Sequence, residues 1–207
     1  MTRNKRTVGL MCGTFDPPHL GHLILAQTAM RQIPLDEVWF LPVGQPPHKS
    51  GVTAAKHRMA MTAAAIAGNP DFVLDKTDVN RPAPHFTADL IPILCEKHPE
   101  ADFWFIMGGD SLRTLHSWER AHVLIDLCQL AVLERPGEFI DWDYLEAQLP
   151  AVRSAVRLIS GLSMYISSTQ IRQDLAEGIR LRYVLPPAVG DYIEREQLYA
   201  PAPEGAL

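Results

Sequence analysis

The chain has 207 residues, a length typical of one domain, and its 47% hydrophobic and 21% charged residues are the proportions of a globular protein rather than a disordered or fibrous one. The formal net charge of −5 argues against nucleic-acid binding, and no stretch reaches the roughly 18 apolar residues of a membrane span. Three scattered cysteines without a CxxC pair argue against a disulfide framework. We therefore expect a cytoplasmic protein with neither a nucleic-acid nor a membrane partner.

Short apolar runs alternate with amphipathic stretches along the chain. The runs that predict strands are residues 8–12, 38–41, 72–74, 103–107, 130–133 and 156–159. The stretches that predict helices are residues 20–31, 54–67, 87–97, 111–126, 141–148, 168–176 and 187–195. Continuous apolar runs are typical of parallel strands that are covered on both faces. The pattern predicts an α/β fold with a Rossmann-like, doubly wound, mainly parallel sheet and a small helical C-terminal part.

We expect a single domain in three parts. A Rossmann-like core would span residues 7–165, a helical part would span 166–199, and 200–207 would form a flexible tail. Ligands of such sheets bind at the carboxyl ends of the strands. The candidate site residues should therefore lie in the loops that follow the strands.

The loop after the first predicted strand has the features of an anion site. It reads Gly13-Thr14-Phe15-Asp16-Pro17-Pro18-His19-Leu20-Gly21-His22. Gly13 lets the backbone turn sharply, and the N–H groups of Thr14 and Phe15 near a helix start can bind an anion. His19 and His22 are three residues apart and would share one helix face. The combination predicts a phosphate site with two imidazole donors, in preference to a zinc pair or a plain proline-bent turn.

A second candidate phosphate segment lies near the far end of the chain, at the start of a predicted helix. Ser167 and Gln170 fit a capping box, which by itself predicts only a well-capped helix. The same helix start carries two spare hydroxyls, on Ser168 and Thr169, and Arg172 follows one turn later. A helix start of this composition can also bind phosphate groups.

These two segments resemble the motifs of the (T/H)xGH nucleotidyltransferase superfamily. The first loop resembles the signature that binds the triphosphate of ATP or CTP, and the second segment is similar to the ISSTxIR motif. The resemblance implies catalytic roles for His19, His22 and Arg172, and phosphate contacts from Ser168 and Thr169. It also implies that four residues of the first loop bind ATP: Gly13, Thr14, Phe15 and Gly21.

The sequence between the two segments resembles the bacterial nicotinate-mononucleotide adenylyltransferases. The loop after the second strand is similar to their P-x-x-x-P-P-H-K/R loop, which would place His48 and Lys49 near a substrate phosphate. A later segment resembles their Y-T-x-x-T-L pattern, in which the threonine, here Thr87, contacts the nicotinate carboxylate. Phe86 replaces the tyrosine of that pattern and keeps only its ring, and Asp89 also departs from it.

Further residues follow from the same resemblance. Gly108 and Asp110 match a G-x-D-S-L motif and would bind ATP, with Asp110 accepting from sugar hydroxyls. Trp118 matches a tryptophan that stacks on the pyridine ring, although packing in the core would explain it equally well. Arg135 lies in an R-P-G turn that would approach the ATP phosphates, and Asp16 would contact the substrate.

The resemblance implies adenylyl transfer from ATP to nicotinate mononucleotide, which gives deamido-NAD and pyrophosphate in NAD biosynthesis. The attacking phosphate is already largely ionised at pH 7, so positioning and charge neutralisation should suffice. Mg²⁺ would arrive with ATP, without a dedicated metal site on the protein. The alternatives are an NMN or phosphopantetheine adenylyltransferase, or a non-catalytic nucleotide-binding sensor. The sequence leaves the oligomeric state open.

Overall fold

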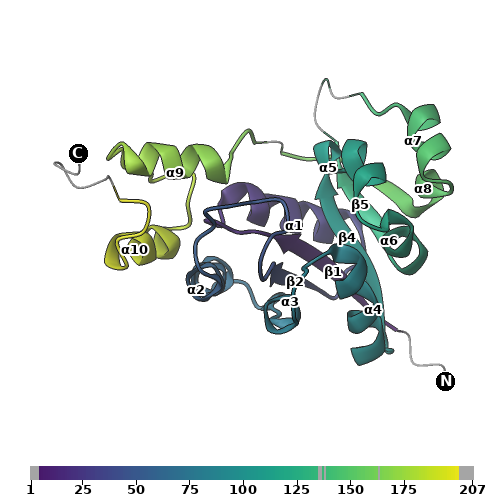
Figure 1. The fold of residues 1–207 in the computed structure, drawn as a ribbon, viewed down its shortest axis with the longest axis horizontal. Helices are drawn as coiled ribbons and strands as arrows, with labels where there is room; N and C mark the ends of the chain where they lie inside the picture. Colours follow the sequence, from purple (N-terminus) through teal and green to yellow (C-terminus); the bar gives the residue numbers. More distant parts are fainter. Residues whose placement is uncertain (1–4, 135–136, 138, 163, 201–207) are drawn as a thin grey trace.

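A computed structural model describes residues 5–134, 137, 139–162 and 164–200. Its centre is one sheet of six strands in the order β3-β2-β1-β4-β5-β6, and every neighbouring pair is parallel (Figure 1). The strands are β1 (Arg6–Gly13), β2 (Glu37–Pro42), β3 (Phe72–Leu74), β4 (Ala101–Gly108), β5 (Gln129–Leu133) and β6 (Val156–Ile159). Each predicted apolar run forms one of these strands, and the Rossmann-like α/β fold is confirmed.

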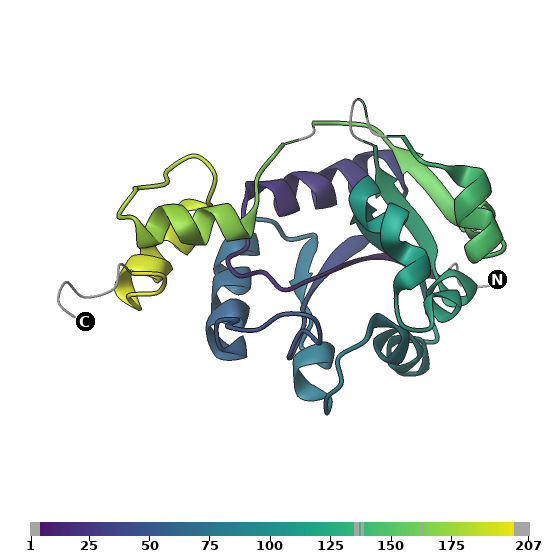
Figure 2. The ribbon, with the colours of Figure 1, turned by 45° about the horizontal axis from the view of Figure 1, so that its top comes forward.

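Helices fill the connections between the strands. They are α1 (Leu20–Gln32), α2 (Ala55–Ile66), α3 (Thr77–Asn80), α4 (Thr87–Lys97), α5 (Gly109–Thr114), the 3₁₀ helix η1 (Leu115–Ser117), α6 (Ala121–Leu127), α7 (Trp142–Gln148), α8 (Val152–Ala155), α9 (Ser168–Ala176) and α10 (Pro187–Arg195). Figures 1 and 2 show α9 and α10 beyond one side of the sheet and α7 and α8 at the opposite side. None of the helices in the described part of the chain is long and apolar enough for a membrane span.

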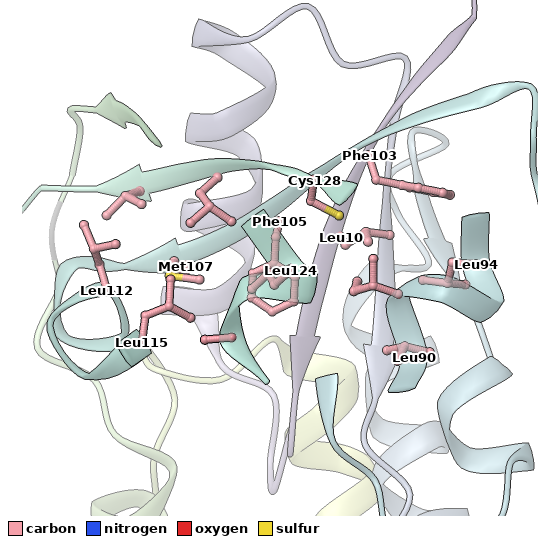
Figure 3. Packing of buried hydrophobic residues seen from close by; sticks show 14 of the residues in the cluster. Leu10, Leu90, Leu94, Phe103, Phe105, Met107, Leu112, Leu115, Leu124 and Cys128 are labelled. Atoms are coloured by element: carbon pink, nitrogen blue, oxygen red, sulfur yellow. The ribbon is translucent and has the colours of Figure 1, made fainter. Parts of the chain in front are cut away.

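The core has one layer of side chains on each face of the sheet. On one face α4, α6, α7 and α8 pack against β1, β4 and β5, and Figure 3 shows Leu90, Leu124 and Phe105 among the residues that meet there. On the other face α1 contributes Ala26 and Ala29, and Ile33 follows directly after the helix. Because both faces are covered, the strands consist of nearly continuous apolar residues, which explains why the sequence pattern predicts them so well.

A third apolar cluster joins α2 to the C-terminal helices. It contains Met61 of α2, Ile171 of α9 and, from α10, Val189 and Ile193. The contact holds α9 next to the first loop without adding a strand to the sheet. The division of the domain at residue 165 stays a prediction, and residues 201–207 of the expected tail lie outside the described part.

The structure corrects three sequence expectations. The single helix predicted for 111–126 is divided into α5, η1 and α6, because the chain leaves the helix at Trp118 and Arg120 adopts a left-handed conformation with φ 48°. The short helices α3 and α8, of four residues each, are not predicted, since they are too brief to show a period. Ser167 holds the N-cap position of α9, but its side chain makes no capping hydrogen bond.

Candidate active site

The two predicted phosphate segments line one cavity of about 460 Å³ at the carboxyl end of β1. The lining residues are Thr14, Phe15, Asp16, His19, His22, Lys49, Ser50, Gly51, Val52, Ser167, Ser168, Thr169 and Arg172. Hydrogen bonds fix the start of α9 to the first loop: Arg172 Nη1 donates to the carbonyl of Asp16 at 2.7 Å, and Ser168 Oγ donates to the carbonyl of Pro17 at 2.9 Å. Segments 156 residues apart thus form one wall.

His19 and His22 form a stacked pair at the start of α1. Their ring centroids lie 3.7 Å apart with 24° between the planes, and the backbone N–H of His19 donates to Nδ1 of His22 at 3.1 Å. Nδ1 of His22 is therefore an acceptor, and the proton of the neutral ring is on Nε2. A Cβ on Gly21 would lie 3.0 Å from Nδ1 of His19, so a larger residue at position 21 would crowd this ring.

Burial sets the charge of both rings. It lowers the pKa of His19 to about 4, and it lowers the pKa of His22 well below its usual value, where His19 and Lys49 add to the effect. Both imidazoles are consequently neutral near pH 7 in the free protein. They can donate N–H groups to a phosphate, while positive charge at the cavity comes from Lys49 and Arg172.

His48 and Lys49 are neighbours in sequence but face different cavities. Lys49 Nζ donates to Oγ1 of Thr14 at 3.1 Å, and Lys49 lines the phosphate cavity. His48 lines a separate cavity of about 440 Å³ between the loop after β2 and the start of α6. Its ring centroid is 6.1 Å from that of Phe86.

This second cavity has an aromatic lining and is called the aromatic pocket below. Its lining residues are Pro47, His48, His85, Phe86, Thr87, Ala88, Ser117, Trp118, Glu119, Arg120, Ala121 and Leu124. Three predicted residues, Phe86, Thr87 and Trp118, thus meet here. The interruption between η1 and α6 brings Trp118 to this place, and its ring also packs edge-on against Phe105, 6.1 Å between centroids.

A third cavity of about 270 Å³ adjoins the phosphate cavity and has both polar and apolar lining residues. The predicted residues Gly21, Gly108 and Asp110 line it, together with apolar side chains of α1 and β4 and with Leu162, Met164 and Ile166. It shares His19 and His22 with the phosphate cavity and Trp118 with the aromatic pocket.

A fourth, narrow cavity of about 180 Å³ lies between the phosphate cavity and the aromatic pocket. It shares Thr14 with the phosphate cavity and His85, Thr87 and Trp118 with the aromatic pocket, and Gly13 also lines it. The cavities therefore form one cleft along the carboxyl ends of the strands, where ligands of doubly wound sheets bind.

The chain is similar to known proteins over most of its length. The cytidylyltransferase-like family model matches residues 10–174. "Probable nicotinate-nucleotide adenylyltransferase" of Thermomicrobium roseum is 41% identical over 194 residues, which cover 93% of this chain and 91% of that one. The protein of the same name from Herpetosiphon aurantiacus is 41% identical over 193 residues, covering 93% and 98%. The chain belongs to the nicotinate-nucleotide adenylyltransferases.

A solved structure of distant sequence supports the fold of this family member. The Plasmodium falciparum nicotinic acid mononucleotide adenylyltransferase complexed with NaAD superposes with a TM-score of 0.77 at 22% identity. The match covers 94% of this chain and 97% of that one.

Two predicted residues need separate mention. Arg135, the predicted phosphate ligand of the R-P-G turn, lies outside the described residues. Asp16 lines the phosphate cavity, but its buried carboxylate already accepts hydrogen bonds from the Tyr199 hydroxyl at 2.5 Å and the Thr53 N–H at 3.1 Å. In this adenylyltransferase the carboxylate therefore joins three parts of the chain around the cavity.

Sequence reasoning missed Arg58, which organises the loops of the cleft. Its side chain is 1% exposed and donates to the carbonyls of Thr53 at 2.8 Å, Thr14 at 2.8 Å, Val43 at 2.7 Å and Gly44 at 2.5 Å. Its guanidinium thus supports both loops that carry predicted phosphate ligands. The available signal was a charged residue on the apolar face of a predicted helix.

Proposed function

We propose that the chain transfers the adenylyl group of ATP to the phosphate of nicotinate mononucleotide, which releases pyrophosphate and forms deamido-NAD. The observation that carries this proposal is the single cleft in which a phosphate cavity adjoins both a smaller pocket and an aromatic pocket. A reaction that joins two mononucleotides through their phosphates requires this arrangement. An oxygen of the mononucleotide phosphate bonds to the α-phosphorus of ATP, and the bond from that phosphorus to pyrophosphate breaks.

The chain would promote this reaction without a general base. A phosphate monoester is largely ionised at pH 7, so the nucleophile needs no deprotonation. The obstacle is the repulsion between two anions as they approach each other. Fixed hydrogen-bond donors and cations reduce this repulsion most in a site that excludes water. Neutral His19 and His22 would donate N–H groups to the ATP phosphates, and Lys49 and Arg172 would supply positive charge. The bond from Arg172 to the Asp16 carbonyl holds its guanidinium at the cavity wall.

The remaining predicted residues would hold the two substrates in place. Gly108 and Asp110 line the smaller pocket, where they would bind the ATP nucleoside. Phe86 and Trp118 would hold the pyridine ring in the aromatic pocket, with Thr87 at the start of α4. This placement favours the substrate role of Trp118, because its ring is only partly buried and borders three cavities.

We further propose that Mg²⁺ enters with ATP and neutralises charge on its phosphates. Within the described ranges, no group of three His, Cys, Asp or Glu side chains is placed to hold a metal ion. Asp16, the carboxylate at the phosphate cavity, is already occupied by Tyr199 and Thr53. Phosphate oxygens and water would therefore provide most of the ligands, as is usual for Mg²⁺. We place the reaction in the cytoplasm, where Cys12, Cys95 and Cys128 would stay free thiols.

One assay tests the proposed function against its alternatives. Purified protein would receive MgATP with nicotinate mononucleotide, NMN or phosphopantetheine, and pyrophosphate release would be measured for each. We expect the highest kcat/KM with nicotinate mononucleotide. A higher kcat/KM with NMN or phosphopantetheine would identify that compound as the substrate instead. ATP binding without pyrophosphate release would favour a non-catalytic nucleotide-binding sensor.

A further inference from the structure

His85 lies in the cleft, although no sequence motif assigns a role to this residue. Its side chain is buried, and it lines both the aromatic pocket and the narrow cavity that leads toward the phosphate cavity. The imidazole ring packs directly against the backbone of Gly44, because a Cβ there would lie 2.1 Å from Cε1 of His85. Any larger residue at position 44 would displace the ring, which therefore has a fixed position in the cleft.

Asp78 lies next to the same ring. Its Oδ2 is 3.4 Å from Nδ1 of His85, and this nitrogen is shut off from solvent without a hydrogen-bond partner among the described residues. The carboxylate of Asp78 also accepts from the Gly44 N–H at 2.9 Å and from Nε of Arg81 at 2.7 Å. With Nδ1 directed at Asp78, Nε2 of His85 is the ring atom left for a ligand.

The two arginines near the aromatic pocket, Arg81 and Arg120, are already engaged. Arg81 donates to Asp78 and to the carbonyls of Pro84 at 2.6 Å and Phe86 at 2.9 Å. Arg120, which lines the pocket, is paired with Asp89 at 2.5 Å. The positive end of α4 begins two residues after His85 and adds a field that favours an anion.

We propose that His85 is a specificity-determining residue whose imidazolium, held by Asp78, donates a hydrogen bond from Nε2 to the carboxylate of nicotinate. The proposal rests on the proposed function and names the group that selects the acid over the amide. A neutral His85 that keeps its proton on Nδ1, toward Asp78, would present Nε2 as an acceptor, which suits the NH₂ group of an amide. The preference for the acid should therefore decrease as the pH rises.

Several charged or titratable side chains surround His85. The titratable and charged side chains around it are Asp78, Arg81, His48, Glu119, Arg120 and Cys12. Asp78 brings a negative charge to within 3.4 Å of the ring and Arg81 is paired with that carboxylate, while burial raises the pKa of the Cys12 thiol and keeps it neutral. The phosphate group of the substrate titrates alike in both mononucleotides, so it cancels in the ratio of their rates.

The test is the ratio of kcat/KM for nicotinate mononucleotide to kcat/KM for NMN between about pH 6 and pH 8.5. In the unmodified protein this ratio should fall with rising pH. His85→Asn and His85→Ala should lower the ratio at the acid end by about 10- to 100-fold, the usual worth of one hydrogen bond to a charged group. Both variants should lose most of the pH dependence of the ratio. The lower ratio should come from a lower kcat/KM with nicotinate mononucleotide, while kcat/KM with NMN changes little.

Two other histidines serve as comparisons. His122 is exposed on α6 outside the cavities, so His122→Asn should leave both the rates and the ratio unchanged. His48→Asn changes the histidine that lines the same pocket, and it should lower both rates alike while the ratio keeps its pH dependence. A pH-independent ratio in His48→Asn would assign the effect to that residue and overturn the proposal.

Other outcomes separate the inference from the proposed function. An unchanged ratio in both His85 variants, or equal losses with both mononucleotides, would overturn the role of His85. If the unmodified protein forms product from neither mononucleotide, the proposed function fails by itself. Binding of the two mononucleotides, followed by tryptophan fluorescence, still tests His85 in that case, and a selective loss of affinity for the acid in His85→Asn would support it.

Discussion

His22 combines a fixed tautomer with a low pKa, and the two features together define what it can do. Its Nδ1 accepts from the His19 backbone, which leaves Nε2–H as a donor that needs no proton uptake. A donor fixed before the reaction stabilises developing charge better than mobile water does. The stacked ring of His19 and the edge contact of Phe15, 5.0 Å between centroids, hold this donor in place.

Replacement of His22 by alanine should therefore affect the reaction step more than substrate binding. We expect kcat to fall about 10²- to 10³-fold, the usual effect of removing one such donor, with a smaller change in the KM for ATP. Steady-state kinetics with His122→Ala as the exposed control would measure this. Turnover near that of the unmodified protein would refute the role of His22.

The neutral histidine pair also predicts how stability depends on pH. The unfolded chain takes up protons on these imidazoles below about pH 6.5, whereas the folded chain resists protonation of His19 until about pH 4. Stability should therefore fall as the pH drops through this window, by on the order of 2 kcal/mol for His19, and His22 acts in the same direction. Urea unfolding between pH 7 and pH 4 would measure the loss, and His19→Asn should reduce its slope.

At the scale of elements, strands and helices followed from the sequence wherever an apolar run or stripe was long enough. The interruption of the predicted helix 111–126 did not follow, since no glycine or proline marks it. There the contacts of Trp118 in the cleft and of Arg120 with Asp89 override local helix propensity. The first loop and the start of α9 were predictable because the candidate phosphate-binding residues of each segment are close together in sequence.

The residues that sequence reasoning missed act between elements. Arg58 joins loops through four carbonyl groups, His85 depends on Gly44 and Asp78, and Tyr199 reaches the Asp16 carboxylate. None of these contacts has a sequence pattern, because the partners meet only after the elements pack. Tyr199 follows α10, so its hydroxyl ties the C-terminal helices to the loop that precedes α1.

Tyr199→Phe tests this connection. The change removes one donor to a buried carboxylate, so we expect a loss of about 1–3 kcal/mol in the free energy of unfolding. A looser first loop should also raise the KM for ATP more than it lowers kcat. Urea unfolding and ATP kinetics would measure both effects, with Tyr183→Phe as a control because that side chain is 86% exposed. Equal stability and kinetics in both variants would show that the bond contributes nothing.

At the scale of the whole molecule, an acidic protein of net charge −5 handles substrates that are themselves anions. The cleft resolves this conflict locally, since Lys49 and Arg172 face the phosphate cavity. The Asp16 carboxylate is occupied by hydrogen bonds from Tyr199 and Thr53, and Asp78 is paired with Arg81. The general field of the molecule cannot attract the substrates. Recognition must therefore come from contacts at short range.

A ligand that contacts both phosphate segments should stabilise the complete fold. ATP at 100 times its Kd should add about 2.7 kcal/mol to the free energy of unfolding, because it binds the folded chain only. AMP lacks the β- and γ-phosphates, so it should bind more weakly and add less at the same concentration. Thermal unfolding with Mg²⁺ and either nucleotide would measure the difference, and equal stabilisation at equal concentration would show that the α9 segment does not contact the outer phosphates.

Asp16 and Arg172 are 156 residues apart in sequence, so the ribosome makes the two segments that line the phosphate cavity at different times. A ribosome releases the first loop long before it makes α9, and N-terminal parts of a chain can fold while synthesis continues. A growing chain can therefore assemble most of the sheet and the aromatic pocket while the wall of the phosphate cavity is still missing. Nascent molecules would neither capture nor consume ATP until the helix that carries Arg172 has emerged.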